Sequence, residues 1–223
     1  MDVLAFLRDR MRFIRGFYAT AGAPFCETMR KIEAGEAPFE PPYSEDGEPP
    51  FLEEWIEADT ALDVLGRACV SMVGASLKLY FETWEGQLGV VWEKGERKKT
   101  FENGFLQGYR KCFADILGLS WDECPADLEI LEQVTLARNR DQHPDSITRM
   151  GVNHTPSDRE KYPRLFFASE AERRMYDDPD MAGISWMNPS VRVSRESLLT
   201  AIGEVEKLAE WLEPKILAAQ YRR

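Results

Sequence analysis

A short polar stretch, Arg138-Asn139-Arg140-Asp141-Gln142-His143-Pro144, carries the residue types best suited to chemistry in this chain. It holds one of only two histidines among 223 residues. An imidazole titrates near neutral pH and can act as a general acid or base, and an arginine fork suits phosphate oxygens. The stretch therefore predicts a general acid or base beside an arginine and an amide, with Arg138, Asn139 and His143 as its candidate residues.

The predicted helix over residues 126–142 must position these side chains. Its apolar residues recur on one face, and Arg138 comes next along the same stripe after Leu128, Leu131, Val134 and Thr135. An arginine on a core-facing stripe is a local conflict, which indicates either a functional residue or a buried structural ion pair. In an ideal helix Arg138 and His143 are about 140° apart. Pro144 disfavours helical geometry at His143, so we expect the helix to end near Gln142 and free the imidazole to turn toward the arginine.

The charge balance restricts the kind of partner. The 28 basic and 39 acidic side chains give a formal net charge of −11, which repels phosphate backbones at long range. The net charge therefore disfavours nonspecific coating of nucleic acid, and a nucleic-acid substrate would need a local basic pocket or a dimer cleft. The densest positive run, Lys94, Arg97, Lys98 and Lys99, is either a solvated turn or a phosphate-facing loop.

The four cysteines form no CxxC pair, so we interpret them as small buried hydrophobic residues in a reducing compartment. With two histidines in the chain, this pattern argues against a zinc site, and no cofactor is expected. The N-terminal stretch has no apolar run of signal-peptide length. The most apolar helix, around residues 60–81, contains Asp63, Arg67 and Lys78. We predict a cytoplasmic protein that does not enter a membrane.

Hydrophobic periodicity predicts one mostly α-helical domain spanning residues 1–223. The first helix is expected to break or kink at Gly22-Ala23-Pro24 and to end at Gly35, before a proline-rich acidic loop over 36–50. Four further helices are expected over residues 51–84, from a Thr100 cap to 117, over 126–142, and from a Ser194 cap to Pro214. Residues 145–193 are predicted to be an insertion with a small β-hairpin, drawn from strands at 165–168, 184–186 and 191–193, and a short helix at 169–176.

The segment from Leu136 to His143 resembles the RNxxxH form of the signature of HEPN domains, which are small helical bundles of prokaryotic toxin–antitoxin, antiphage defence and RNA-processing systems. The Val-Ser-Arg-Glu-Ser-Leu-Leu opening of the last helix, residues 193–199, is also similar to such domains. The resemblance implies a two-fold homodimer whose motifs meet in a shared cleft. In active members it implies a metal-independent endoribonuclease. In one subgroup a tyrosine two residues after the histidine is modified, and this chain has Asp145 there.

Under this resemblance His143 is the base or acid, Arg138 clamps the phosphate, and Asn139 orients the pair or the substrate. Arg140 and Asp141 are supporting residues, and Asp141 either pairs with an arginine or tunes His143. The alternative is a non-catalytic helical homodimer that binds a partner protein such as an antitoxin. The hypotheses differ in whether Arg138 and His143 are open to a cleft or buried with carboxylate partners.

Overall fold

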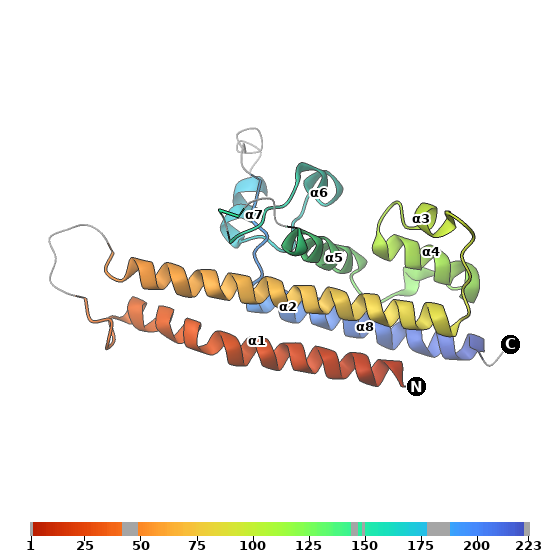
Figure 1. Cartoon of the computed structure of the whole chain (residues 1–223), viewed down its shortest axis with the longest axis horizontal. Helices are drawn as coiled ribbons and strands as arrows, with labels where there is room; N and C mark the ends of the chain where they lie inside the picture. The colour runs from red at the N-terminus through yellow and green to blue at the C-terminus, as the bar shows by residue number, and fades with distance from the viewer. Residues whose placement is uncertain (1, 42–48, 144–146, 149, 178–187, 221–223) are drawn as a thin grey trace.

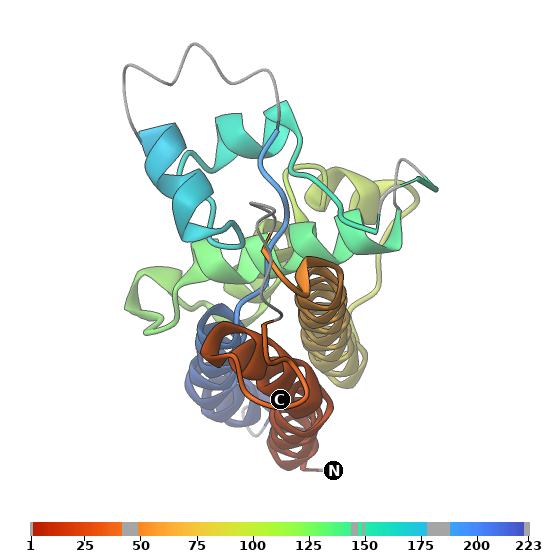
Figure 2. The same cartoon turned by 90° about the vertical axis from the view of Figure 1, so that its left-hand side faces the viewer.

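The computed structural model describes residues 2–41, 49–143, 147–148, 150–177 and 188–220, which form a helical bundle (Figure 1). The mostly α-helical class is confirmed. Three long helices lie side by side, and the shorter helices pack along one side of them (Figures 1 and 2). The long helices are α1 (Val3–Ala34), α2 (Leu52–Gln87) and α8 (Arg195–Gln220). The shorter ones are α3 (Glu96–Thr100), α4 (Phe105–Leu117), a 3-10 turn (Trp121–Glu123), α5 (Leu128–Gln142), α6 (Pro156–Lys161) and α7 (Glu170–Asp177).

Helix α2 is the centre of the bundle, because it packs against α1, α5 and α8. Its buried stripe includes Val73, Leu77, Phe81 and Trp84, each at most 1% exposed. Phe81 stacks on Tyr109 of α4 with ring centroids 4.6 Å apart. Of the described helices, α2 has the length and mean hydropathy of a membrane span, a property that core helices of bundles share. Burial of this stripe contributes to the apolar core together with the buried residues of α1, α4, α5 and α8.

Helix α1 runs without interruption through Gly22 and Pro24, so the predicted break is wrong. Gly22 is buried, and a Cβ there would lie 3.2 Å from a methyl group of Leu62. The glycine therefore permits the close approach of α1 and α2, and this packing outweighs the local cost of a proline inside a helix. The predicted end at Gly35 is confirmed, since Gly35 has φ 62° and its N–H donates to the Ile32 carbonyl.

Helix α8 also continues through a proline, because Pro214 lies inside it and the helix ends at Gln220. The predicted stop at Pro214 is therefore wrong. The turn beyond the proline buries Ile216 completely, which stabilises helical structure there. At the other end the predicted cap is confirmed, since the Ser194 hydroxyl accepts from the Ser197 N–H at 3.1 Å. The predicted Thr100 cap is wrong: Thr100 ends α3, and α4 begins after Gly104.

The predicted β-hairpin is not seen in the described part of the insertion. Residues 165–168 and 191–193 contain no strand, and residues 184–186 lie outside the described residues. One isolated bridge joins Asn153 and Ser190. The alternating apolar residues serve a different purpose: Phe167, Val191 and Val193 are buried against the helices rather than across a sheet. The predicted short helix is confirmed as α7, and α6 was not predicted.

Candidate functional site

The candidate motif occupies the last turn of α5. Asp127 caps the start of the helix by accepting from the Ile130 N–H at 3.1 Å. The helix ends at Gln142, as predicted, and His143 has φ −130° and ψ 64°. The His143 N–H still donates to the Asn139 carbonyl at 3.1 Å. The imidazole therefore leaves the helix at its carboxyl end, in an exposed position.

Arg138 lies half-buried against α2, where a glycine makes room for it. A Cβ on Gly74 would be 3.0 Å from Cδ of Arg138 and 3.4 Å from its Cβ, so only glycine lets the stem lie this close. Nε of Arg138 is buried without a hydrogen-bond acceptor. Nη1 donates to Oδ1 of Asn139 at 3.4 Å. Among the described residues no carboxylate forms an ion pair with Arg138, so the structural ion pair considered above is not formed there.

Arg140 points to the insertion instead. Its Nε and Nη2 each donate to a carboxylate oxygen of Asp158 at 3.0 Å, and Nη2 also donates to Thr155 Oγ1 at 2.9 Å. Burial alone would raise the pKa of Asp158, yet the Arg140 fork and the Thr155 hydrogen bonds more than offset burial and lower that pKa. Because Asp158 also completes the capping box of α6, Arg140 fixes α6 to the motif turn.

Asp141 points to α2. It accepts from the Ser71 hydroxyl at 2.9 Å and from Nε of Arg67 at 3.4 Å. Of the two roles foreseen for Asp141, the structure shows the pairing with an arginine. In the described part of the chain no hydrogen bond or ion pair joins Asp141 to His143. Arg140 and Asp141 thus anchor the motif turn on opposite sides, while Arg138, between α2 and Asn139, has no charged partner among the residues that the structure describes.

Arg67 is a site residue that the sequence reading missed. It is 3% exposed and forms an ion pair with Asp63 one turn earlier on α2. Its Nη2 donates to the Met150 carbonyl at 2.6 Å. The buried guanidinium of Arg67 therefore binds both Asp141 at the end of α5 and the backbone of Met150, which follows the motif in the sequence. The spacing of Asp63 and Arg67 in an apolar helix was the available signal, but the partner on α5 could not be seen in the sequence.

The two histidines occupy opposite environments. His143 and Asn139 are exposed, whereas His154 is 4% exposed and its Nε2 lies 2.8 Å from the Phe167 carbonyl. Burial lowers the pKa of His154, although the bond to that carbonyl opposes the shift. His154 is therefore a structural residue of the insertion. Arg149 and His154 have the same spacing in the sequence as Arg138 and His143, but His154 is buried in the insertion and Arg149 lies outside the described residues.

Comparisons with protein-family models, with curated proteins and with solved structures found no match for this chain. Within the described residues no group of three or more histidine, cysteine, aspartate or glutamate side chains is placed to hold a metal ion. The four cysteines are free thiols; Cys69 and Cys112 are buried, as predicted, whereas Cys124 is half-buried and Cys26 is exposed. The case for function therefore depends on the geometry of the motif turn.

Proposed function

We propose that this chain is a HEPN-like protein that binds RNA and cleaves it without a metal, through Arg138, Asn139 and His143. The observation that best supports this proposal is that Arg138 lacks a charged partner among the described residues. Arg140 pairs with Asp158 and Asp141 pairs with Arg67, whereas the Arg138 guanidinium has no carboxylate among the described residues. The buried Nε of Arg138 has no acceptor within the described part of the chain, and the guanidinium fork is therefore available to an anion such as a phosphate, whose geometry it fits.

The proposed reaction needs only proton transfers and charge stabilisation. The 2′-oxygen attacks phosphorus, its proton passes to a base, and the bond from phosphorus to the 5′-oxygen breaks as an acid protonates that oxygen. The products are a 2′,3′-cyclic phosphate and a 5′-hydroxyl. His143 is exposed at the end of α5 and serves as base or acid, and Arg138 stabilises the charge on the phosphorane. One chain supplies one such histidine, and a second copy would supply the other.

The supporting residues hold this arrangement in place. Asp141 bonds to Ser71 of α2, and Arg140 bonds to Asp158 of α6. The last turn of α5 is therefore held from two sides. A turn held in this way keeps Arg138 and Asn139 in one orientation before substrate binds, which is the preorganisation that electrostatic catalysis needs. The net charge of −11 slows the approach of RNA, so we propose a weakly binding enzyme whose association is faster at higher ionic strength.

The test is cleavage of a mixed-sequence single-stranded RNA in EDTA, with analysis of the product ends. The wild type should leave 2′,3′-cyclic phosphate ends. Removal of the proton-transfer group in His143→Ala should slow cleavage by roughly 10²–10⁴-fold. Arg138→Ala should slow it by roughly 10²–10³-fold. Arg174→Ala is the matched control for charge, because Arg174 is 77% exposed on α7 and its loss changes the net charge equally.

Folding of each variant is checked by circular dichroism and by thermal unfolding. A wild type that leaves the RNA intact at high protein concentration would contradict the proposal. So would His143→Ala cleaving as fast as the wild type. Either result would favour the second candidate, a non-catalytic homodimer that binds a partner protein. The feature that supports this candidate is an apolar face of α1 and α2 on which Phe6, Phe13 and Leu79 are exposed.

A further inference from the structure

The insertion after the motif carries a group of arginines around one tyrosine. The guanidinium of Arg159 of α6 lies over the ring of Tyr176 of α7, 4.5 Å from its centroid. Arg164, between the two helices, and Arg173 of α7 line a small hollow together with the same tyrosine. Arg164 and Arg173 are exposed, and Arg159 is half-buried. We call Arg159, Arg164, Arg173 and Tyr176 the arginine hollow.

Three carboxylates of the insertion are engaged elsewhere. Asp158 binds Arg140 of the motif turn. Glu172 accepts hydrogen bonds from two serines of the insertion, and Glu170 pairs with Arg174. Among the described residues no carboxylate forms an ion pair with the three arginines of the hollow. Three like charges therefore lie around one ring without a counter-ion, in a chain whose net charge is −11.

Guanidinium groups gathered in this way are suited to a phosphate. Each carries N–H donors in a fixed geometry that matches phosphate oxygens, and an anion relieves the repulsion between neighbouring cations. A tyrosine ring beside them offers a surface on which an unpaired base can stack, and guanidinium planes offer another. The arginine hollow thus combines the two elements of single-strand recognition, which are cations for the backbone and an aromatic ring for a base.

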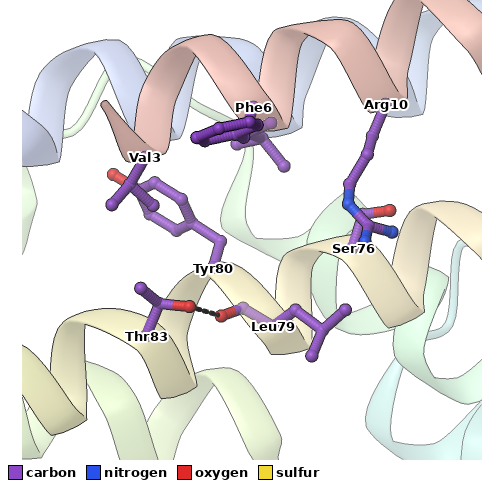
Figure 3. A pocket seen from close by; sticks show the side chains of 8 residues that line it. Val3, Phe6, Arg10, Ser76, Leu79, Tyr80 and Thr83 are labelled. Atoms are coloured by element: carbon purple, nitrogen blue, oxygen red, sulfur yellow. Dashed lines mark hydrogen bonds between the residues drawn. The ribbon is translucent and has the colours of Figure 1, made fainter. Parts of the chain in front are cut away.

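The hollow between α1 and α2 is larger but has a different chemistry. It has a volume of about 260 Å³ and is lined by side chains that include Phe6 and Leu79, as Figure 3 shows. Of the described residues that line it, only Arg10 is charged. The Thr83 hydroxyl donates to the Leu79 carbonyl within α2. One cation among apolar groups does not make a phosphate site, so Arg10 provides a control for the arginine hollow.

The insertion is tied to the candidate site through α6. Arg140 of the motif turn binds Asp158 through two hydrogen bonds of 3.0 Å, and Arg159 follows Asp158 directly. The arginine hollow therefore begins one residue away from a contact made by the motif turn itself. His143 is exposed less than one helical turn beyond Arg140. A single strand bound at the motif turn can therefore continue over α6 to the hollow.

We propose that the arginine hollow is a second phosphate-binding site, which holds a nucleotide of single-stranded RNA other than the one at the motif turn. Arg164 and Arg173 bind phosphate oxygens of the RNA chain, and Tyr176 stacks on a base. Arg159 holds the tyrosine ring in place. The inference rests on the proposed function for the identity of the ligand. The hollow acts through binding alone, and the chemistry stays at the motif turn.

The test measures binding separately from cleavage. Fluorescence anisotropy is recorded with a single-stranded 2′-O-methyl RNA, which lacks the attacking hydroxyl and stays intact. Arg164→Gln and Arg173→Gln should each weaken binding by about fivefold. Each should also make the slope of log K against log salt more positive by about 0.7, the value for one phosphate contact on a single strand.

Two further variants complete the binding experiment. Tyr176→Leu should weaken binding by about tenfold, because a stacked base is lost. Arg10→Gln is the matched control for the arginine variants, since it removes the same charge from an exposed arginine of α1 and should bind as the wild type does. Circular dichroism checks that each variant is folded. Displacement of the RNA by a mononucleotide of equal affinity would overturn the assignment of the hollow to a strand.

Cleavage kinetics separate this inference from the proposed nuclease. Because only binding is lost, Arg164→Gln and Arg173→Gln should raise KM and leave kcat close to that of the wild type. If both variants bind and cleave as the wild type does, the inference is overturned and the nuclease stands. Binding that depends on both arginines without any cleavage would support the inference while contradicting the nuclease. A wild type that neither binds nor cleaves RNA would overturn both.

Discussion

Substitution of Gly66 by alanine should destabilise the fold, although alanine normally favours a helix. Gly66 lies in α2 where the segment leading into α8 crosses it. A Cβ at this position would lie 2.5 Å from the Val193 carbonyl oxygen and 2.9 Å from Cβ of Val193. Both contacts are with the backbone or the first side-chain atom, which cannot move by a change of rotamer. The segment before α8 would therefore have to shift away from α2.

The expected magnitude is the difference between two opposing terms. Replacing a glycine in the middle of a helix by alanine stabilises by about 0.5–1 kcal/mol. Overpacking of a tight contact costs about 1–3 kcal/mol, and a clash with backbone belongs at the upper end of that range. Gly66→Ala should therefore lower the free energy of unfolding by about 1–2 kcal/mol. The ion pair of Arg192 with Asp59 lies beside this contact and would be disturbed with it.

Gly203→Ala in α8 is the matched control, because nothing lies within 4 Å of a Cβ there. It should stabilise the protein by about 0.5–1 kcal/mol. Urea unfolding monitored by far-ultraviolet circular dichroism measures both variants, and thermal midpoints should differ by several degrees, at about 2–4 °C for each kcal/mol. If Gly66→Ala proved as stable as Gly203→Ala, the close approach of α2 and the segment before α8 would be refuted.

Two further predictions concern pH. Because the pKa of Asp158 is lowered, its contribution is complete above the unfolded-state pKa of about 3.9 and is lost as the pH falls through the folded-state pKa. Asp158→Asn should therefore lower the free energy of unfolding by about 1–3 kcal/mol near neutral pH, because it weakens the contact with Arg140. Urea unfolding should show that the difference between wild type and variant shrinks in acid. A difference that stays constant with pH would exclude the charged pair as its source. Because the pKa of His154 is also lowered, protonation favours the unfolded chain, and stability should fall from pH 7.5 to 5.5 by at most about 1.4 kcal/mol per pH unit. That slope should disappear in His154→Gln and persist in His143→Gln, and its persistence in both would assign it to other groups.

Helix positions could be predicted from the sequence, because each long helix carries its own apolar stripe. Helix ends at Gly35 and Gly118 were also predictable, since both adopt the left-handed conformation that glycine favours. The prolines at 24 and 214 misled the prediction, because packing of neighbouring helices decides whether a helix continues past them. The alternating apolar residues before α8 also misled the prediction. Such alternation shows only that one side of the segment is buried, and that side can pack on helices just as it can pack in a sheet.

The motif turn was predictable in position but not in its contacts. Pro144 correctly placed the helix end, and Arg138 correctly stood out as an arginine on an apolar stripe. The glycine that accommodates Arg138 could not be foreseen, because Gly74 is 64 residues away and is one of several glycines in the chain. The different partners of Arg140 and Asp141 could not be foreseen either, because Arg140 bonds to α6, which follows α5, and Asp141 bonds to α2, which precedes it. A one-dimensional pattern identifies chemical groups, whereas the partners of those groups depend on tertiary packing.

The pairing of α1 with α8 has a consequence for synthesis on the ribosome. Arg15 of α1 bonds to Glu206 of α8 through two hydrogen bonds of 2.6–2.8 Å, and the Leu4 N–H donates to Glu213, residues about 200 positions later. At about 5–20 residues per second, α1 waits roughly 10–40 s for its last partner. During that interval the nascent chain can form the α1–α2 hairpin and then the packing of α5 on α2, while the apolar surface that α8 covers stays open. Holdase chaperones should therefore meet this chain early in translation and release it only when the final helix has emerged.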